Sequence, residues 1–368
     1  MRITESSIIY DNPLPQLRSR HSFFPWLCEL PDGSLMAVYA VGQAFESVDS
    51  TSCVSFSRDG GRTWTPPRAM FDKSGLSCPV TDYCKAVPLP DGRLIALGYA
   101  YLRPDPEKPI GNPENGGLLD DFLFWAESRD SGQTWSEMRP IPCAWGAHAE
   151  ASAPLTVLQD GSWITPITGF PDWNGNLTGR LCGRALRSYD RGRTWNDDAV
   201  CMAFPGDHVT CYEQRMCQLA SGAILCIGWN EDTQTGERLE NHYTVSCDGG
   251  RSFSAPVSTG VRGQASSLCA LDGDRLLALH AVRRDTDRPG IYGYVVDFSQ
   301  RTWNVVDQAL LWEPNVPLVK DGRMAEIFSF LKFGQPGAIR LRSGEVMMSF
   351  WYAENGQYKT VSARIALD

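Results

Sequence analysis

Apolar segments of strand length recur along the whole chain, and six of them lead into a turn with the pattern L-x-D-G or a close variant. A second apolar segment follows each turn. Glycine accepts the positive φ angle that a tight turn between two strands requires, so each pattern predicts a β-hairpin. No segment shows the helical period of about 3.6 residues, and the chain is therefore predicted to be all-β. The six turns occupy residues 30–33, 89–92, 158–161, 219–222, 270–273 and 341–344.

A second repeat has the pattern S-x-D-x-G-x-T-W, and a fourth copy ends in Ser252-Phe253. A fifth copy keeps only Arg301-Thr302-Trp303. In such a turn the Asp side chain bonds nearby backbone N–H groups, Gly provides the left-handed position, and the Trp can pack between sheets. The repeat therefore predicts a structural turn rather than a set of catalytic aspartates. The four good copies occupy residues 57–64, 128–135, 188–195 and 246–253.

The two repeats together predict six units of four strands, which is typical of a six-bladed β-propeller. In the first unit the strands are expected at residues 23–30, 34–41, 52–57 and 68–71. The last unit ends after its third strand, and residues 2–10 have the composition of a strand. We therefore expect the N-terminal strand to complete the last blade, which closes the ring and leaves no free edge at the seam. A single propeller domain is predicted to span residues 1–368.

The longest connections join second strands to third strands, at residues 101–120, 170–180 and 230–240. In a propeller these connections lie on one face of the ring. Because binding residues are often carried by loops on a rigid scaffold, we expect the ligand to bind at that face.

The composition narrows the choice of partners. The net charge is −9 and there is no basic tract, which argues against nucleic acid and anionic membranes as partners. No apolar run approaches the length of a membrane span, and no secretory signal is visible at the N-terminus. The twelve cysteines form no C-x-x-C pair and no Cys/His cluster, so we expect free thiols in the cytoplasm, no metal site and no cofactor. The oligomeric state stays open.

The S-x-D-x-G-x-T-W repeat resembles the Asp-box (BNR) repeat of the sialidase (neuraminidase) superfamily, and the resemblance covers nearly the whole chain. Sialidases of this superfamily use three arginines to hold the substrate carboxylate, a tyrosine nucleophile supported by a glutamate, and an aspartic acid as general acid. The resemblance thus implies a carbohydrate ligand and glycosidase chemistry.

The family positions are only partly retained. Glu213 matches the family glutamate, and residues 263–266 resemble a motif of the fifth blade. Phe23 and Trp229 stand where two of the arginines are expected, and Gln335 occupies the position of the tyrosine. Neither Phe nor Trp can form the bidentate pair that Arg makes with a carboxylate, so the chain is expected to be a divergent member. The general acid is expected between the second strand of the first blade and its Asp box, where Glu46 and Asp49 are available.

An alignment of the six inner strands on their turns provides a second view of the site. Side chains alternate along a strand, so every second residue before the turn should face the propeller axis. These positions form a ring of polar, charged and aromatic residues that could bind a sugar, or could instead fill the channel as structural pairs such as Glu213–Arg215 and Glu150–Lys85. The predicted ring contains His21, Phe24, Trp26, Tyr83, Lys85, His148, Glu150, Ser152, Glu213, Arg215, Arg262, Gln264, Ser266 and Gln335.

Three functions are compatible with this pattern. The first is a glycoside hydrolase acting on a terminal sugar, with acidic sugars among the candidates; Asp49 or Glu46 would be the acid and Glu213 the second carboxylate. In this hypothesis Lys85, Arg215 and Arg262 supply binding charges. The second is a polysaccharide lyase with His148 or Tyr83 as base. The third is a carbohydrate-binding propeller without catalytic activity.

Overall fold

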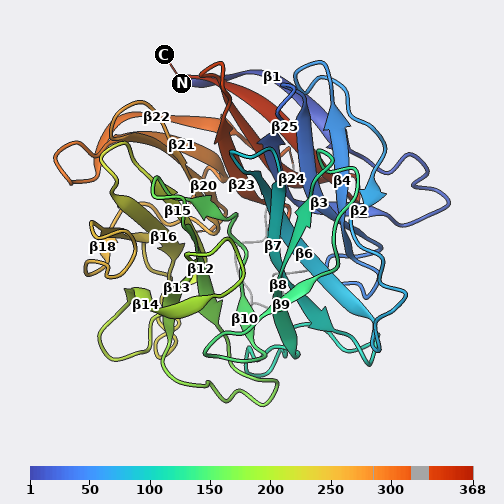
Figure 1. Cartoon of the computed structure of the whole chain (residues 1–368), viewed down its shortest axis with the longest axis horizontal. Coiled ribbons are helices and arrows are strands. Elements are labelled where there is room, and N and C mark those ends of the chain that lie inside the picture. The colour runs from blue at the N-terminus through green and yellow to red at the C-terminus, as the bar shows by residue number, and fades with distance from the viewer. Residues whose placement is uncertain (285, 316–330, 368) are drawn as a thin grey trace.

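The chain folds into β-strands joined by turns and loops. A computed structural model describes residues 1–284, 286–315 and 331–367, and it contains no helix in these ranges. The strands form six sheets arranged in a ring around a central axis (Figure 1). The predicted six-bladed β-propeller is therefore confirmed.

Each blade is an antiparallel sheet whose first strand lies nearest the axis. The first three blades contain β2 (His21–Glu29), β3 (Leu35–Gly42), β4 (Thr51–Ser57) and β5 (Arg68–Ala69); β6 (Val80–Pro88), β7 (Leu94–Leu102), β8 (Asp121–Ser128) and β9 (Arg139–Ile141); and β10 (Ala149–Glu150), β11 (Thr156–Val157), β12 (Trp163–Gly169), β13 (Cys182–Ser188) and β14 (Asn196–Ala203). The other three contain β15 (Tyr212–Gln218), β16 (Ile224–Trp229), β17 (His242–Ser246) and β18 (Val257–Ser258); β19 (Ser266–Ala270), β20 (Arg275–Val282), β21 (Gly290–Asp297) and β22 (Asn304–Trp312); and β23 (Phe333–Arg340), β24 (Val346–Glu354), β25 (Gln357–Ala366) and β1 (Arg2–Tyr10).

The ring closes through the N-terminal strand, as predicted. β1 pairs antiparallel with β25, and the two described ends of the chain lie side by side (Figure 1). The Ser7 hydroxyl is 3.0 Å from that of Ser362 in β25 and accepts a hydrogen bond from Trp64 of the first blade. The strand therefore joins the last blade to the first without a covalent link.

Deletion of residues 1–10 is expected to destabilise the whole propeller. It would uncover the edge of β25 and expose Ile9 and Tyr10, which are 5% and 8% exposed in the intact chain. Burial of two such side chains contributes about 3–6 kcal/mol, which corresponds to a fall in Tm of about 4–8 °C or more for a chain of this size. Thermal unfolding followed by circular dichroism would test this. A synthetic peptide of residues 1–10 should restore part of the loss, whereas an unchanged Tm would contradict the closure described above.

The Asp boxes act as turn staples. Asp59 accepts hydrogen bonds from the backbone N–H of Thr63 at 2.9 Å and from its hydroxyl at 2.6 Å. The same pair of bonds links Asp130 to Thr134, Asp190 to Thr194 and Asp248 to Ser252. These bonds lower the pKa of Asp59 and Asp190, because they favour the ionised carboxylate. The aspartates are thus committed to the turns and are not available for catalysis.

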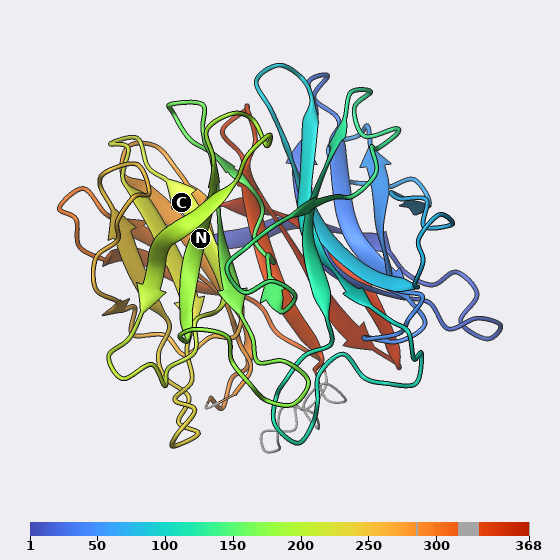
Figure 2. The same ribbon diagram turned by 60° about the horizontal axis from the view of Figure 1, so that its bottom comes forward.

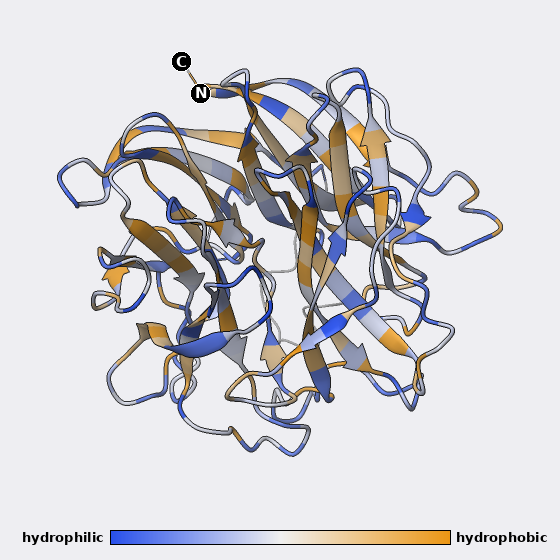
Figure 3. Ribbon diagram, viewed as in Figure 1, coloured by the Kyte–Doolittle hydropathy of each residue, from blue (hydrophilic) through white to orange (hydrophobic). Residues whose placement is uncertain are grey.

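Hydrophobic residues are concentrated on the strands of the blades, while the loops are mostly hydrophilic (Figure 3). Every residue of β3 is buried, and Trp163 and Trp351 are among the largest fully buried side chains. The long connections that follow the second strands project to one side of the ring (Figure 2). All twelve cysteines lie in the described part of the chain, and none forms a disulfide. The described ranges contain no helix long and apolar enough to cross a membrane.

Candidate functional site

A pocket of about 430 Å³ opens at the centre of the face that carries the long connections. All six blades contribute to its wall, and residues from the connections after β7, β12 and β16 complete it. The blades contribute, in chain order, Phe24, Tyr83, Glu150, Glu213, Gln264 and Gln335, each from an inner strand or the residues just before it. The predicted ring therefore exists in part, and its residues share one cavity.

A β-bulge in three inner strands directs side chains into this pocket. Phe24, Glu213 and Gln335 have positive φ angles of 56°, 41° and 42°, and the pairing register skips one residue at each of these positions. Residues with side chains adopt this conformation rarely, at a cost of about 1–3 kcal/mol each. The bulge breaks the simple alternation expected from sequence and turns the side chain at this position towards the axis.

The fifth blade corrects the alignment made from the sequence. Its turn is closed by the Leu271 N–H donating to the Arg275 carbonyl, the bond that Leu30 makes in the first blade. Leu271, and not Ala270, is therefore the equivalent residue, and the positive φ falls on Ala265 at 61°. Gln264 still lines the pocket, but Arg262 lies too far upstream and is exposed outside it.

Glu213 is held at the centre of the pocket by two N–H donors. The Trp229 indole donates to Oε2 at 2.7 Å, and the Gln335 amide donates to Oε1. These two donors stand at the positions where the family resemblance implied an arginine and the tyrosine nucleophile. The third altered position, Phe23, is fully buried and packs against Phe45 and Trp351. Of the three residues that differ from the family pattern, Trp229 and Gln335 therefore donate to Glu213, and Phe23 is part of the core.

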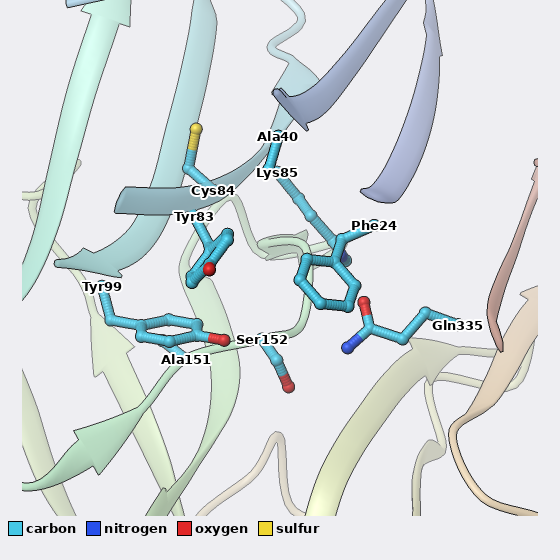
Figure 4. A pocket seen from close by; sticks show the side chains of 9 residues that line it. All are labelled: Phe24, Ala40, Tyr83, Cys84, Lys85, Tyr99, Ala151, Ser152 and Gln335. Carbon is cyan, nitrogen blue, oxygen red and sulfur yellow. The ribbon is translucent and has the colours of Figure 1, made fainter. Parts of the chain in front are cut away.

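A small cationic cluster lies beneath the pocket floor. The Arg215 guanidinium donates to the Ser152 hydroxyl at 3.0 Å and to the Gln214 carbonyl at 2.8 Å. Lys85 lines a minor cavity of about 10 Å³ together with Ser152 and Gln335, and Figure 4 shows this opening. Burial and the neighbouring charge of Arg215 lower the pKa of Lys85 to about 7. Lys85 and Arg215 therefore lie below the ligand pocket rather than in its wall.

Glu150 faces the same pocket as Glu213, but its environment is different. Burial and the negative charge of Glu213 raise its pKa to about 7, although a hydrogen bond from Ser152 and the charges of Arg215 and Lys85 oppose this shift. Two carboxyl groups in one low-dielectric site cannot both ionise freely. Glu150 therefore keeps its proton to a higher pH than an ordinary glutamate, with its pKa close to neutral pH.

The two acids proposed from the sequence have different positions. Glu46 lines the pocket, accepts a hydrogen bond from the Ile110 N–H at 3.2 Å, and has a pKa raised by burial. Asp49 is exposed and is not part of the pocket wall. Its carboxylate accepts a hydrogen bond from the Gln43 N–H at 3.1 Å, because it closes the short turn of its own loop.

The two histidines of the predicted ring lie outside the pocket wall. His21 accepts a hydrogen bond from the Tyr358 N–H at 3.2 Å and thereby ties β2 to β25. His148 pairs with Asp120 at 2.9 Å. His21 is the first residue of β2, and His148 directly precedes β10. Their contacts are with neighbouring segments of the chain and not with the pocket. Tyr83 does line the pocket, and its hydroxyl donates to the Phe45 carbonyl at 3.3 Å.

Several wall residues come from positions that the inner-strand alignment did not sample. Arg283 follows β20 and donates to the carbonyls of Phe333 and Gln264, at 3.2 and 3.1 Å. Burial lowers its pKa to about 10, and the nearby charge of Glu213 opposes that shift. Two consecutive arginines, Arg283 and Arg284, follow the second strand of the fifth blade, and this pair was the feature of the sequence that could have pointed to the pocket. The other unpredicted wall residues include Phe45, Tyr99, Tyr101, Phe170, Tyr212, Glu231, Arg284 and Trp351.

Some polar atoms around the pocket have no hydrogen-bond partner among the described residues. They are the side-chain oxygens of Gln264 and Gln335, Nε of Arg283 and Nε1 of Trp351. Buried polar groups are normally paired, but these atoms are enclosed by the protein, so they lie behind the pocket surface and are not exposed in it. In the described ranges, no group of three or more His, Cys, Asp or Glu side chains is arranged to hold a metal ion.

Comparisons with known proteins agree with this architecture. The profile of the BNR repeat-like domain matches residues 110–313. A protein of unknown function from Dyadobacter fermentans is 19% identical, with a TM-score of 0.74 over 100% of this chain and 99% of that one. A Hadza microbial sialidase is 18% identical (TM-score 0.66; 94% and 66% covered), and the intramolecular trans-sialidase from Ruminococcus gnavus is 12% identical (TM-score 0.65; 98% and 97% covered). At these identities the likeness concerns the fold. No curated protein matches the chain significantly.

Proposed function

Because the chain belongs to the BNR repeat-like domain family of sialidase-superfamily propellers, we propose that it is a divergent glycoside hydrolase that acts on a terminal sugar. One observation carries the proposal: Glu150 and Glu213 line the same pocket, and burial together with the charge of Glu213 raises the pKa of Glu150. Hydrolysis of a glycosidic bond needs such a pair, one carboxylic acid to protonate the leaving oxygen and one carboxylate to attack or to activate water.

The surroundings of the two groups suggest their roles. Glu150 has a pKa of about 7 and can donate its proton to the glycosidic oxygen. Glu213 has both oxygens oriented by N–H donors, so it is positioned either to attack the anomeric carbon or to take a proton from water. Glu46, whose pKa is raised by burial, is the second candidate for the acid.

The remainder of the wall suits a sugar ring. Tyr99, Tyr212 and Trp351 line the pocket and offer aromatic faces on which a sugar ring can pack. Arg283 and Arg284 add positive charge on one side of the pocket, which would favour a sugar with a carboxylate.

The two alternatives have less support. A lyase would need Tyr83 or His148 as base, but burial raises the pKa of Tyr83 and its hydroxyl is engaged, while His148 lies outside the pocket wall. A carbohydrate-binding protein without activity would explain why the positions of two family arginines and of the tyrosine are occupied by Phe23, Trp229 and Gln335.

Turnover of a broad panel of oligosaccharides and aryl glycosides would test the proposal. We expect release of a terminal sugar without a new double bond. An unsaturated product that absorbs in the ultraviolet would support the lyase instead. Binding by calorimetry without turnover of any panel member would support the non-catalytic alternative and overturn the proposed hydrolase.

A further inference from the structure

A second large cavity lies away from the central pocket, between the second and third blades at their Asp-box ends. Its volume is about 540 Å³, and five of its nine lining residues are arginines. One wall comes from the second blade, around the end of β8 and the start of β9, and the other is the Asp-box turn between β13 and β14. The chain as a whole has a net charge of −9, so this concentration of positive charge is local. The arginines are Arg93, Arg129, Arg139, Arg191 and Arg193.

The acidic residues of this cavity are already engaged. Glu127 is 11% exposed and lies 2.9 Å from Arg93, 3.2 Å from Arg129 and 3.6 Å from Arg139. Arg93 is also paired with Asp91 at 2.9 Å, so Glu127 is the carboxylate that Arg129 and Arg139 share. Asp190 is used by its own turn, where it accepts two hydrogen bonds from Thr194.

The opposite wall carries two exposed arginines. Arg191 and Arg193 are exposed, and neither forms an ion pair within the part of the chain that the structure describes. On the facing wall, the Arg139 guanidinium stacks on the Trp125 ring at 4.6 Å. A guanidinium stacked in this way is held in one plane and keeps its N–H edges for hydrogen bonding. The cavity therefore has oriented donors on one side and unpaired charges on the other.

We propose that this cavity binds a sulfate or phosphate ester carried by a sugar. Arginine forms bidentate hydrogen bonds with tetrahedral oxyanions, and several arginines around one cavity match a dianionic group better than a single carboxylate. The cavity volume of about 540 Å³ fits one or two sugar units and is too small for a nucleic-acid duplex. The negative charge of the rest of the chain would repel a long polyanion, which favours a short anionic glycan over nucleic acid. This site is independent of the hydrolase pocket.

The other Asp boxes supply variants that the fold already tolerates. The position of Arg191, at φ 61°, is occupied by Gly60 and Gly249 in two other boxes, and that of Arg193 by Gln133. The double variant R191G/R193Q therefore removes both charges without straining the turn. R251Q, at the position equivalent to Arg193 in the fourth box, removes one charge outside the cavity and is the matched control for the single variant R193Q.

Calorimetric titration at constant ionic strength would use inorganic sulfate, inorganic phosphate, a sulfated disaccharide and a sugar phosphate as probes. We expect binding of at least one sugar ester, a loss of about tenfold or more in R191G/R193Q, and a change of less than about twofold in R251Q. R129A on the facing wall should also weaken binding. The relative affinities of the two esters identify which oxyanion the site prefers. Absence of binding, equal losses in R251Q, or tighter binding of a DNA oligonucleotide than of both esters would overturn the proposal.

Discussion

Replacement of Glu213 by glutamine is expected to lower kcat/KM for the hydrolysed glycan by about 10²- to 10⁴-fold, the usual range for loss of a positioned acid–base group. Glutamine has the same shape but no charge: its oxygen can still accept from Trp229, and its NH₂ group can donate to the oxygen of Gln335, which has no partner among the described residues of the wild type, once that amide turns over. The substitution therefore removes the negative charge while the side chain keeps its place in the pocket. Initial rates on the best substrate of the panel, with Tm measured in parallel, would test this.

Two further variants make this test specific. Trp229→Phe removes only the indole donor at 2.7 Å and should cost about tenfold, which corresponds to one hydrogen bond to a charged group. Asp49→Asn is the matched control for a carboxylate outside the pocket wall, and it should keep activity close to that of the wild type. If Asp49→Asn abolished hydrolysis while Glu213→Gln retained it, the assignment of the pocket would be wrong.

The pH dependence of hydrolysis should reveal Glu150. Its pKa is raised to about 7, above the ordinary value, so it is protonated below that pH and ionised above it. An acid that must donate a proton is active only in its protonated form, and kcat/KM should therefore fall as the pH rises through about 7. In Glu150→Gln this alkaline limb should disappear, and the activity on unactivated glycosides should fall by about 10²-fold or more.

The leaving group separates catalysis from structural damage. An aryl glycoside with a very acidic phenol departs without protonation, so Glu150→Gln should retain most of the wild-type rate on it. Glu46→Gln provides the comparison for the second candidate acid. Equal losses on both kinds of substrate in Glu150→Gln, or the same pH limb in that variant, would contradict the role of Glu150.

The repeats in the sequence were sufficient to predict the architecture. The turns depend on local signals, namely Gly at positive φ and Asp bonding its own turn, and these are readable without tertiary information. The last unit lacked a fourth strand, and residues 2–10 were the segment available to supply it; their pairing with β25 confirms that inference.

The site was only partly predictable, because its geometry depends on long-range features. The bulge at Glu213 and Gln335 interrupts the alternation of side chains, and it becomes visible only when the pairing registers are known. Arg283 joins the pocket from the end of a second strand, which an alignment of inner strands does not sample. Asp49 and Glu46 lie three residues apart in the same loop. Only the folded structure shows that Asp49 closes a turn of that loop and that Glu46 lines the pocket.

In the proposed hydrolase, Glu213 is the carboxylate at the reacting centre. The most direct measurement is a crystal structure of Glu213→Gln with an oligosaccharide that the wild type hydrolyses. We expect a sugar ring in the pocket, with its anomeric carbon about 3–3.5 Å from the residue 213 side chain or from a water bound to it, and with the glycosidic oxygen within hydrogen-bonding reach of Glu150. A sugar bound with its anomeric carbon away from both residues would contradict this role of Glu213.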